Sequence, residues 1–94
     1  MSHTTSTISI RPNTDVPFWD YPAEVKAHIE ENYVTPGLRL SVEKTFSDDQ
    51  TIRTYTTTWK DKESYIAFLN DPIMLACRQE IEAYNNSNNI VSFQ

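Results

Sequence analysis

A β-hairpin predicted between Thr35 and Trp59 constrains the fold of this 94-residue chain more than any other stretch. After Thr35-Pro36-Gly37, apolar and polar residues alternate, and the apolar row consists of Leu38, Leu40, Val42 and Phe46. This alternation predicts a half-buried strand, because successive side chains of a strand point to opposite faces. Ser47-Asp48-Asp49-Gln50 has the composition of a turn. The run from Thr51 to Trp59 is rich in the β-branched and aromatic residues typical of strands.

The length of the connecting loop decides which side chains share a face. A two-residue turn and a four-residue loop predict the same pairs, Val42 with Tyr55, Leu40 with Thr57 and Leu38 with Trp59. One face then carries Leu38, Leu40, Val42, Phe46, Tyr55 and Trp59, and the other carries Arg39, Ser41, Glu43, Thr45, Ile52, Thr54, Thr56 and Thr58. An odd loop would place Trp59 among charges. We therefore predict helices over the first face, and water or another subunit against the second.

The N-terminal part of the chain predicts one strand and one helix. Residues 1–4 are expected to form a disordered tail, and the alternation of residues 5–11 predicts a strand. Asp20 is a candidate N-cap for a helix with Pro22 near its first positions. The apolar stripe of this helix comprises Val25, His28, Ile29 and Tyr33. This spacing is that of one helical face.

The C-terminal part predicts two helices and a last strand. Asp61 is a candidate cap for a helix, and Asp71 with Pro72 starts another after a break. The buried side of the last helix is predicted to comprise Ile73, Met74 or Leu75, Cys77, Ile81 and Tyr84. Residues 85–89 are expected to form a polar loop, and residues 90–93 a short strand. The order β-α-β-β-α-β predicts a ferredoxin-like α+β sandwich with an antiparallel sheet, as one domain over residues 1–94.

Composition argues against several classes of function. The net charge is −5 and the pI is near 4.8, whereas nucleic acids and anionic membranes attract clustered basic residues. The chain has a single cysteine, Cys77, which excludes an internal disulfide. Cys77 is predicted to be a core residue. The N-terminus lacks the apolar segment of a signal peptide and no run reaches membrane length, so a cytoplasmic protein is expected. Neither a metal-ligand spacing nor a glycine-rich phosphate loop is present, so no cofactor is expected.

The hairpin and the following helix resemble the antibiotic biosynthesis monooxygenase (ABM) type of dimeric α+β barrel. Pro36-Gly37 precedes a strand as in that family, and Trp59, Asp61, Ala67, Leu69 and Asp71-Pro72 are similar to its pattern of Trp-x-Asp, a helix and Leu-x-Ser-Pro. The motif covers about residues 36 to 72. The resemblance implies a homodimer with two sheets packed across a two-fold axis, and a ligand pocket between each sheet and its own helices. It also implies a small enzyme that acts without metal or flavin on an aromatic or polyketide-like molecule.

Two positions depart from the family pattern. Phe68 stands where the family often has a histidine, and Thr57 stands where it often has a glutamate. Members that degrade haem or use that histidine are therefore poor guides to this chain. A fold carries over between relatives more readily than an activity.

Six residues are candidates for the site. Trp59 and Tyr55 would position a planar substrate, although core aromatics have the same pattern. The substrate-binding set is completed by Phe68, Thr57 and Tyr33. His28 is the candidate catalytic residue, because its ordinary pKa suits proton transfer. A packed structural histidine is the alternative.

Three functional hypotheses follow. The first is the monooxygenase-like enzyme, and the second is a non-catalytic homodimer that binds a small ligand or a partner protein. The third, a ferredoxin-like RNA-binding module, fits the strand order but lacks the basic and aromatic motif of such sheets. In a dimer, Arg39 and Glu43 on the second hairpin face would cross the subunit interface. In a monomer they would be solvated.

Overall fold

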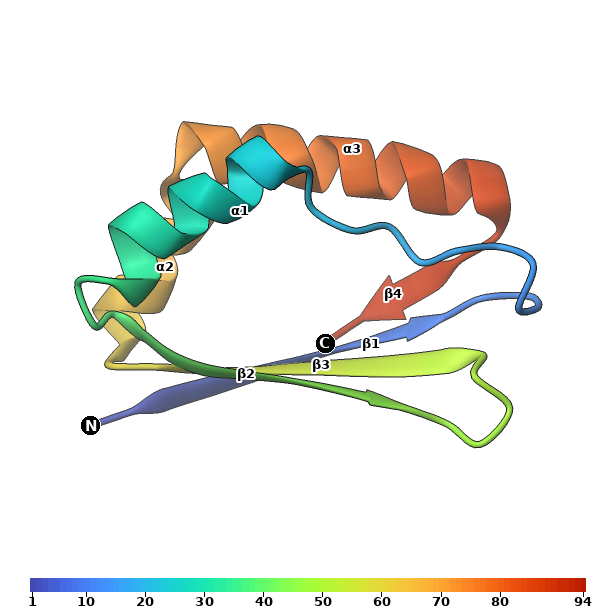
Figure 1. Ribbon diagram of the computed structural model, residues 1–94, viewed down its shortest axis with the longest axis horizontal. Helices are drawn as coiled ribbons and strands as arrows, with labels where there is room; N and C mark the ends of the chain where they lie inside the picture. Colours follow the sequence, from blue (N-terminus) through green and yellow to red (C-terminus); the bar gives the residue numbers. More distant parts are fainter.

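All the helices lie on one side of a four-stranded antiparallel sheet in the computed structural model, which describes all 94 residues (Figure 1). The strands are β1 (His3–Ile10), β2 (Arg39–Phe46), β3 (Ile52–Trp59) and β4 (Val91–Phe93), in the lateral order β2-β3-β1-β4. The helical segments are α1 (Ala23–Ile29), the π-helical turn η1 (Glu30–Val34), α2 (Lys62–Asn70) and α3 (Pro72–Asn88). The chain is thus a small α+β protein, consistent with the predicted ferredoxin-like class.

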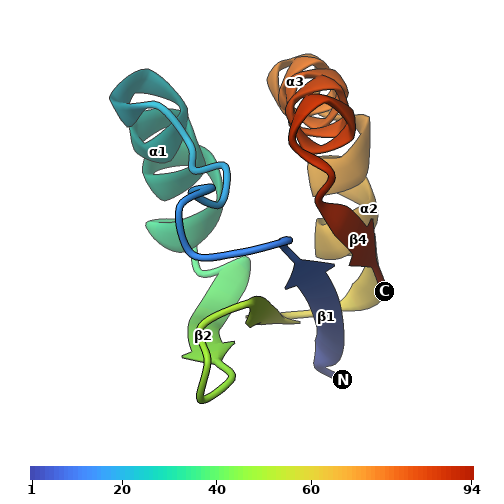
Figure 2. The ribbon, with the colours of Figure 1, turned by 90° about the vertical axis from the view of Figure 1, so that its right-hand side faces the viewer.

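The helices divide into two groups above the sheet. Viewed along the sheet, α1 lies above the β2 side, whereas α2 and α3 lie above the side of β1 and β4 (Figure 2). No element covers the opposite face. We call the helix-covered side the inner face and the uncovered side the outer face. Crossing a membrane would take a longer and more apolar helix than any of these.

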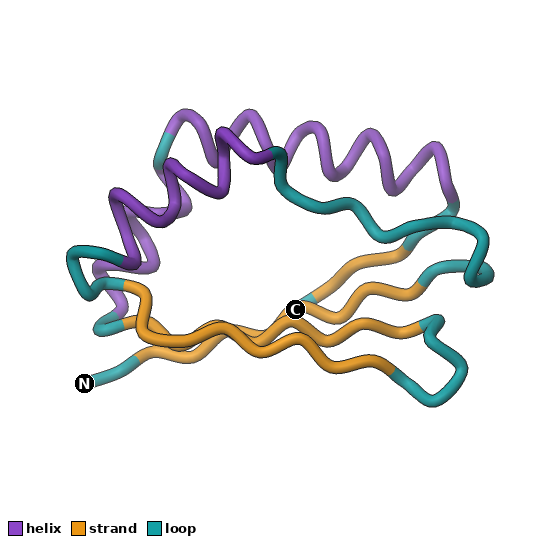
Figure 3. Tube along the Cα trace, viewed as in Figure 1, coloured by secondary structure: helices purple, strands orange, loops and turns teal.

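The starts of α2 and α3 confirm the predicted caps. The Asp61 carboxylate accepts a hydrogen bond from the Ser64 backbone N–H at 2.8 Å, and Asp71 accepts one from the Ile73 N–H at 2.9 Å. Pro72 occupies the first position of α3, where its missing N–H is not needed. The break between the two helices is visible in Figure 3.

Pro22 lies at the start of α1 as predicted, but the predicted cap, Asp20, was wrong. Pro22 occupies the N-cap position without a side-chain cap, and the helix begins at Ala23. The Asp20 carboxylate instead accepts from the Tyr21 backbone N–H at 2.9 Å and pairs with Lys26 at 3.3 Å. The carboxylate therefore bonds to its neighbour's amide and to a lysine one turn into the helix, which leaves it unavailable as a cap.

Two element ends also differ from the predictions. β1 begins at His3, within the expected disordered tail, because β3 is long enough to pair His3 with Trp59 and Thr4 with Thr58. α3 continues through the expected polar loop to Asn88. It stops where Asn89 adopts a left-handed conformation, with φ at 57°, which asparagine tolerates better than most residues.

The hairpin register is shifted by two residues from the predicted one. Val42 lies opposite Thr57 rather than Tyr55, and Phe46 lies opposite Arg53. The four-residue loop comprises residues 48–51, because the Ser47 N–H already bonds to the Ile52 carbonyl at 2.9 Å. A shift of two residues preserves the faces, so Tyr55 and Trp59 lie on the inner face as predicted.

A β-bulge at Leu40 overturns the predicted faces at the start of β2. Arg39 pairs with Trp59 and Ser41 with Thr58, so Leu40 is an extra residue without a partner in the ladder. The bulge returns Arg39 to the inner face, where it meets Tyr55, whereas Arg39 was expected beside Glu43 on the outer face. Leu40, expected under the helices, is 57% exposed.

The core lies at the helix junction rather than across the whole inner face. Val25, Ile29, Met74 and Cys77 form one buried cluster, in agreement with the expected core role of Cys77, whereas Ile73 is exposed, contrary to prediction. The inner face of β1 is polar, with Thr5, Thr7 and Ser9, and its isoleucines, Ile8 and Ile10, lie on the outer face. The sheet is therefore polar in the middle of the side that its helices cover.

Candidate functional site

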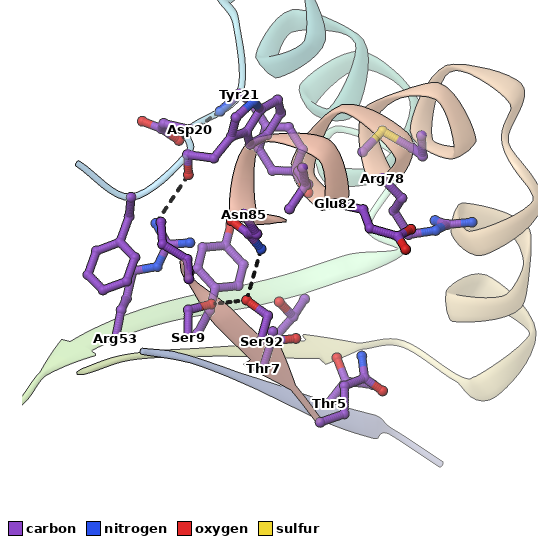
Figure 4. A pocket seen from close by; sticks show the side chains of 18 of the residues that line it. Thr5, Thr7, Ser9, Asp20, Tyr21, Arg53, Arg78, Glu82, Asn85 and Ser92 are labelled. Carbon is purple, nitrogen blue, oxygen red and sulfur yellow. Dashed lines mark hydrogen bonds between the residues drawn. The ribbon is translucent and has the colours of Figure 1, made fainter. Parts of the chain in front are cut away.

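A cavity of about 700 Å³ lies between the inner face and the helices. Its sheet side includes the hydroxyl side chains Thr5, Thr7 and Ser9 of β1, Thr57 of β3 and Ser92 of β4. The loop from Arg11 to Pro22 and the two helices α2 and α3 supply the other walls. Figure 4 shows these side chains converging from the strands, the loop and α3. The volume lies within the usual range of small-molecule sites.

One end of the cavity is aromatic. Trp59 contacts Phe68 with ring centroids 4.8 Å apart and Tyr65 with centroids 5.8 Å apart. Trp59 is only 2% exposed, so it is a core side chain that also borders the cavity. Its indole N–H is buried without a hydrogen-bond partner, which is uncommon for a buried tryptophan. This end suits the ring of a planar ligand.

The middle of the sheet side carries Tyr55 surrounded by cations. The Arg39 guanidinium donates a hydrogen bond to the Tyr55 hydroxyl at 2.7 Å. Lys44, directly opposite Tyr55 on β2, places its ammonium 5.7 Å from the ring centroid. The Arg39 guanidinium and the Lys44 ammonium both lie within the distance typical of cation–π contacts with the Tyr55 ring.

The far end of the cavity is formed by Arg53 and the loop before α1. The Arg53 guanidinium stacks over the Phe18 ring at 4.7 Å and donates a long hydrogen bond of 3.4 Å to the Trp19 carbonyl. Burial lowers the pKa of Arg53, although the Asp20 carboxylate partly opposes this shift. Arg53 is thus a partly desolvated cation without a carboxylate within ion-pair distance.

Three polar side chains at the β4 end of the cavity are paired with one another. Ser9 and Ser92 hydroxyls lie 2.7 Å apart, and the Asn85 amide donates to the Ser92 hydroxyl at 3.2 Å (Figure 4). The Arg78 guanidinium bonds to the Leu69 carbonyl and points away from the other labelled side chains in the figure. Ser9, Ser92, Asn85 and Arg78 thus have partners within the chain, whereas Arg39 and Arg53 keep N–H donors without a partner.

Four of the six predicted site residues line the cavity: Trp59, Tyr55, Phe68 and Thr57. Tyr33 lies just behind it, with its ring packed edge-on against Phe68 at 5.1 Å and Trp59 at 6.2 Å. His28 is not among the lining residues. Its Nε2 atom lies 2.7 Å from the Asp71 carboxylate.

Asp71 connects His28 and Tyr33 to the start of α3. One of its carboxylate oxygens accepts from the Tyr33 hydroxyl at 2.6 Å and contacts His28, while the other caps Ile73. Burial alone would raise the pKa of Asp71, but the hydrogen bonds from Tyr33, His28 and Ile73 outweigh it and lower the pKa. Burial and the hydrogen bond to Asp71 raise the pKa of Tyr33 to about 12. Asp71 therefore links α1 and η1 to the start of α3.

The sequence prediction missed the two arginines of the cavity. Arg53 precedes Tyr55 by two residues and therefore shares its strand face, which is a signal that was present in the alternation. Arg39 had no such signal, because only the bulge at Leu40 turns it inward. Phe18 and Trp19 also line the cavity, from a loop with no periodic pattern.

Comparison of the chain with protein-family models, curated proteins and solved structures found no match. No three His, Cys, Asp or Glu side chains are grouped so that they could hold a metal ion. Function is therefore inferred from the geometry of the cavity and from the resemblance carried by residues 36–72.

Proposed function

We propose that this protein binds a small aromatic molecule in the cavity between its sheet and its helices. The observation that supports this most is the polar and aromatic lining of the helix-covered face. A face that served only as core would carry Ile8 and Ile10 inward, whereas here Thr5, Thr7 and Ser9 point to the helices. Sites for small molecules combine aromatic walls with a few polar groups in this way.

We also propose that the protein forms a homodimer of the ABM-type α+β barrel kind, with the outer faces of two sheets packed together. The outer face carries Ile8, Ile10, Ile52, Val91 and Phe93, which adjoin one another through the pairs Ile10–Ile52, Ile10–Val91 and Ile8–Phe93. We call these five residues the outer apolar patch. Four of them are more than a third exposed in the single chain, and packing sheet against sheet would bury them.

The enzymatic alternative, a monooxygenase that acts without metal or flavin, is supported by the contact between Arg39 and Tyr55. A guanidinium next to a phenol in a partly desolvated cavity would stabilise the anion of a phenolic or polyketide-like substrate, and this anion is the form that would react with oxygen. Tyr55 would position the substrate. A proton-transfer role for His28 remains a hypothesis, since this side chain is bonded to Asp71 outside the cavity.

Binding is tested with an uncharged aromatic probe, 2-naphthamide, by isothermal titration calorimetry. We expect saturable binding with one site per chain. The substitution Thr7→Phe would fill the cavity from β1 and abolish this binding. Thr14→Phe, the same change in an exposed part of the loop before α1, should leave binding unchanged. If 2-naphthamide and its carboxylate analogue both fail to bind, or if Thr7→Phe binds as well as the native chain, the proposed function is wrong.

The enzymatic alternative is tested by oxygen uptake with a panel of naphthalenediols, followed by mass spectrometry of the products. Turnover that inserts one oxygen atom and removes two hydrogens from the substrate, with the second atom of O2 leaving as water, and that falls in Tyr55→Phe would support it. Full turnover in His28→Ala would exclude the proton-transfer role of that residue. Binding without turnover across the panel would favour the non-catalytic homodimer.

A further inference from the structure

Two arginines in the cavity have more N–H donors than there are protein acceptors bonded to them. A guanidinium has five N–H donors, yet Arg39 makes one hydrogen bond, to Tyr55, and Arg53 makes one, to the Trp19 carbonyl. The Nε atoms of both are buried without a partner. Arg11 provides the contrast, because its three nitrogens all bond to backbone carbonyls, two with Gln50 and one with Val16. Arg11 therefore stabilises the loop, whereas Arg39 and Arg53 each keep N–H donors that have no acceptor in the chain.

Both arginines also lack an ion-pair partner within the chain. The only ion pairs in the chain are Lys26–Asp20 and His28–Asp71, so neither cavity arginine contacts a carboxylate. The chain as a whole has a net charge of −5, and the cavity lining includes two acidic residues, Asp20 and Glu82, yet neither forms an ion pair with Arg39 or Arg53. The Asp20 carboxylate interacts favourably with the Arg53 charge at a distance, but its hydrogen bonds are made with Lys26 and the Tyr21 amide. A buried cation without a partner is costly unless a ligand supplies one.

The two guanidiniums lie on either side of one tyrosine. Arg53 and Tyr55 are two residues apart on the same strand face, about 7 Å along the strand, and the Arg39 guanidinium bonds directly to the Tyr55 hydroxyl. Arg53 lies over Phe18 and Arg39 lies 6.0 Å from the Tyr55 ring centroid. Lys44 adds a third cation near Tyr55. Two of the three arginines that line the cavity therefore lie near Tyr55, next to aromatic surface, whereas the third, Arg78, bonds to the Leu69 carbonyl.

We propose that the ligand of this cavity is an aromatic carboxylic acid, whose carboxylate binds between Arg39 and Arg53 while its ring lies toward Trp59 and Tyr65. The proposal deepens the proposed function and rests on it. A carboxylate matches the planar fork of a guanidinium. A phosphate fits less well, because phosphate sites use clustered backbone N–H groups. Here the donors are isolated side chains, and the single glycine of the chain, Gly37, lies outside the cavity lining.

The test compares two probes of equal shape, 2-naphthoate and 2-naphthamide, by isothermal titration calorimetry at fixed ionic strength. We expect the native chain to bind the acid at least about tenfold more tightly than the amide, because charge-assisted hydrogen bonds are about twice as strong as neutral ones. Arg53→Gln and Arg39→Gln should each weaken the acid by a similar factor and leave the amide unchanged. Lys60→Gln, which removes one exposed positive charge outside the cavity, should keep the full preference for the acid.

The outcomes separate the two levels of the proposal. Equal binding of acid and amide by the native chain would overturn the inference and leave the proposed function intact. Absence of binding by both probes would overturn both. A preference for the acid that survives both arginine substitutions would also contradict the inference. Should either glutamine variant fail to fold by circular dichroism, Arg53→Lys and Arg39→Lys, which keep the charge but lose the fork, are expected to retain part of the preference.

Discussion

At the scale of single residues, Asp71 contributes more to the structure than to the cavity. Its carboxylate accepts a hydrogen bond from the Tyr33 hydroxyl of η1, contacts His28 of α1, and caps α3 by accepting from the Ile73 N–H. The side chain that sequence reasoning selected as a general base is therefore held by a carboxylate at the junction of two helices. A histidine on the apolar stripe of a helix indicated burial, but its partner, distant in sequence, could not be predicted from spacing.

The hydroxyl of Tyr33 should stabilise the fold in a pH-dependent way. The pKa of Tyr33 is raised from 10.0 to about 12 by burial and by its hydrogen bond to Asp71, so its contribution is complete below pH 10. The contribution is lost as the pH rises from 10 to about 12. We expect Tyr33→Phe to lower the free energy of unfolding by about 1–2 kcal/mol at pH 8. The difference should shrink above pH 10.

Urea unfolding of the native chain and Tyr33→Phe at pH 8 and pH 11.5 measures this change. The two proteins differ only at residue 33, so the effects of pH on all other groups cancel in the comparison. A difference of the same size at both pH values would show that the Tyr33 hydroxyl does not form the hydrogen bond to Asp71. At the acid end, the lowered pKa of Asp71 means that its contribution is complete above the ordinary pKa of 3.8 and is lost below it.

At the scale of elements, local signals predicted the caps of α2 and α3 and the faces of β3, but not the cap of α1 or the face of Arg39. Asp61 and Asp71 cap helices through contacts within three residues, so their effect is contained in the local sequence. The face of Arg39 depends on the bulge at Leu40. Because Leu40 itself fits the alternation of apolar residues, no residue type marks the bulge. Register along β3 is a property of the pairing between strands, which a single strand does not encode.

The bulge leads to a prediction about deletions. Arg39 and Ser41 pair with consecutive residues of β3, Trp59 and Thr58, so removal of Leu40 leaves a regular ladder with Arg39 still on the inner face. We expect the chain without Leu40 to fold cooperatively, with a free energy of unfolding within about 1 kcal/mol of the native value. Little apolar contact is lost, since Leu40 is 57% exposed. Urea unfolding measures the change.

The matched control is deletion of Thr56 from β3. This strand pairs with both β1 and β2, so the deletion would move part of β3 by one residue against two neighbours and exchange its faces. We expect loss of the cooperative transition. If removal of Leu40 is as damaging as removal of Thr56, then Leu40 is not an extra residue of the ladder.

At the scale of the whole molecule, the single chain is less compact than its size predicts. Its radius of gyration is 13.8 Å, against about 12 Å for a domain of this length. It exposes 6035 Å², against about 5,600 Å² for a monomer of this mass. Only ten of the 94 residues are buried. The cavity was not predictable in detail, because its walls come from α2, α3 and the loop before α1, and no sequence pattern sets the distance of these elements from the sheet.

The outer apolar patch gives the last prediction, that the chain is a dimer in solution. Packing two patches together would bury Ile10, Ile52, Val91 and Phe93, which are now 37% to 58% exposed, at about 25 cal/mol per Å² of apolar surface. Light scattering behind a sizing column should give twice the chain mass of 10.9 kDa. Ile10→Asp and Phe93→Asp should each give the monomer mass, because each would bury an unpaired carboxylate at the interface.

Ile73→Asp is the control for this prediction. Ile73 is 44% exposed like the patch residues, but it lies in the first turn of α3 on the helical side, where an acidic residue suits the helix N-terminus. This variant should remain a dimer. If the native chain is a monomer at 100 µM, the predicted dimer does not form. If Ile73→Asp dissociates the dimer and Ile10→Asp does not, the interface does not include the outer apolar patch. Because Phe93 does not line the cavity, monomeric Phe93→Asp should still bind 2-naphthamide, so assembly and ligand binding are separable.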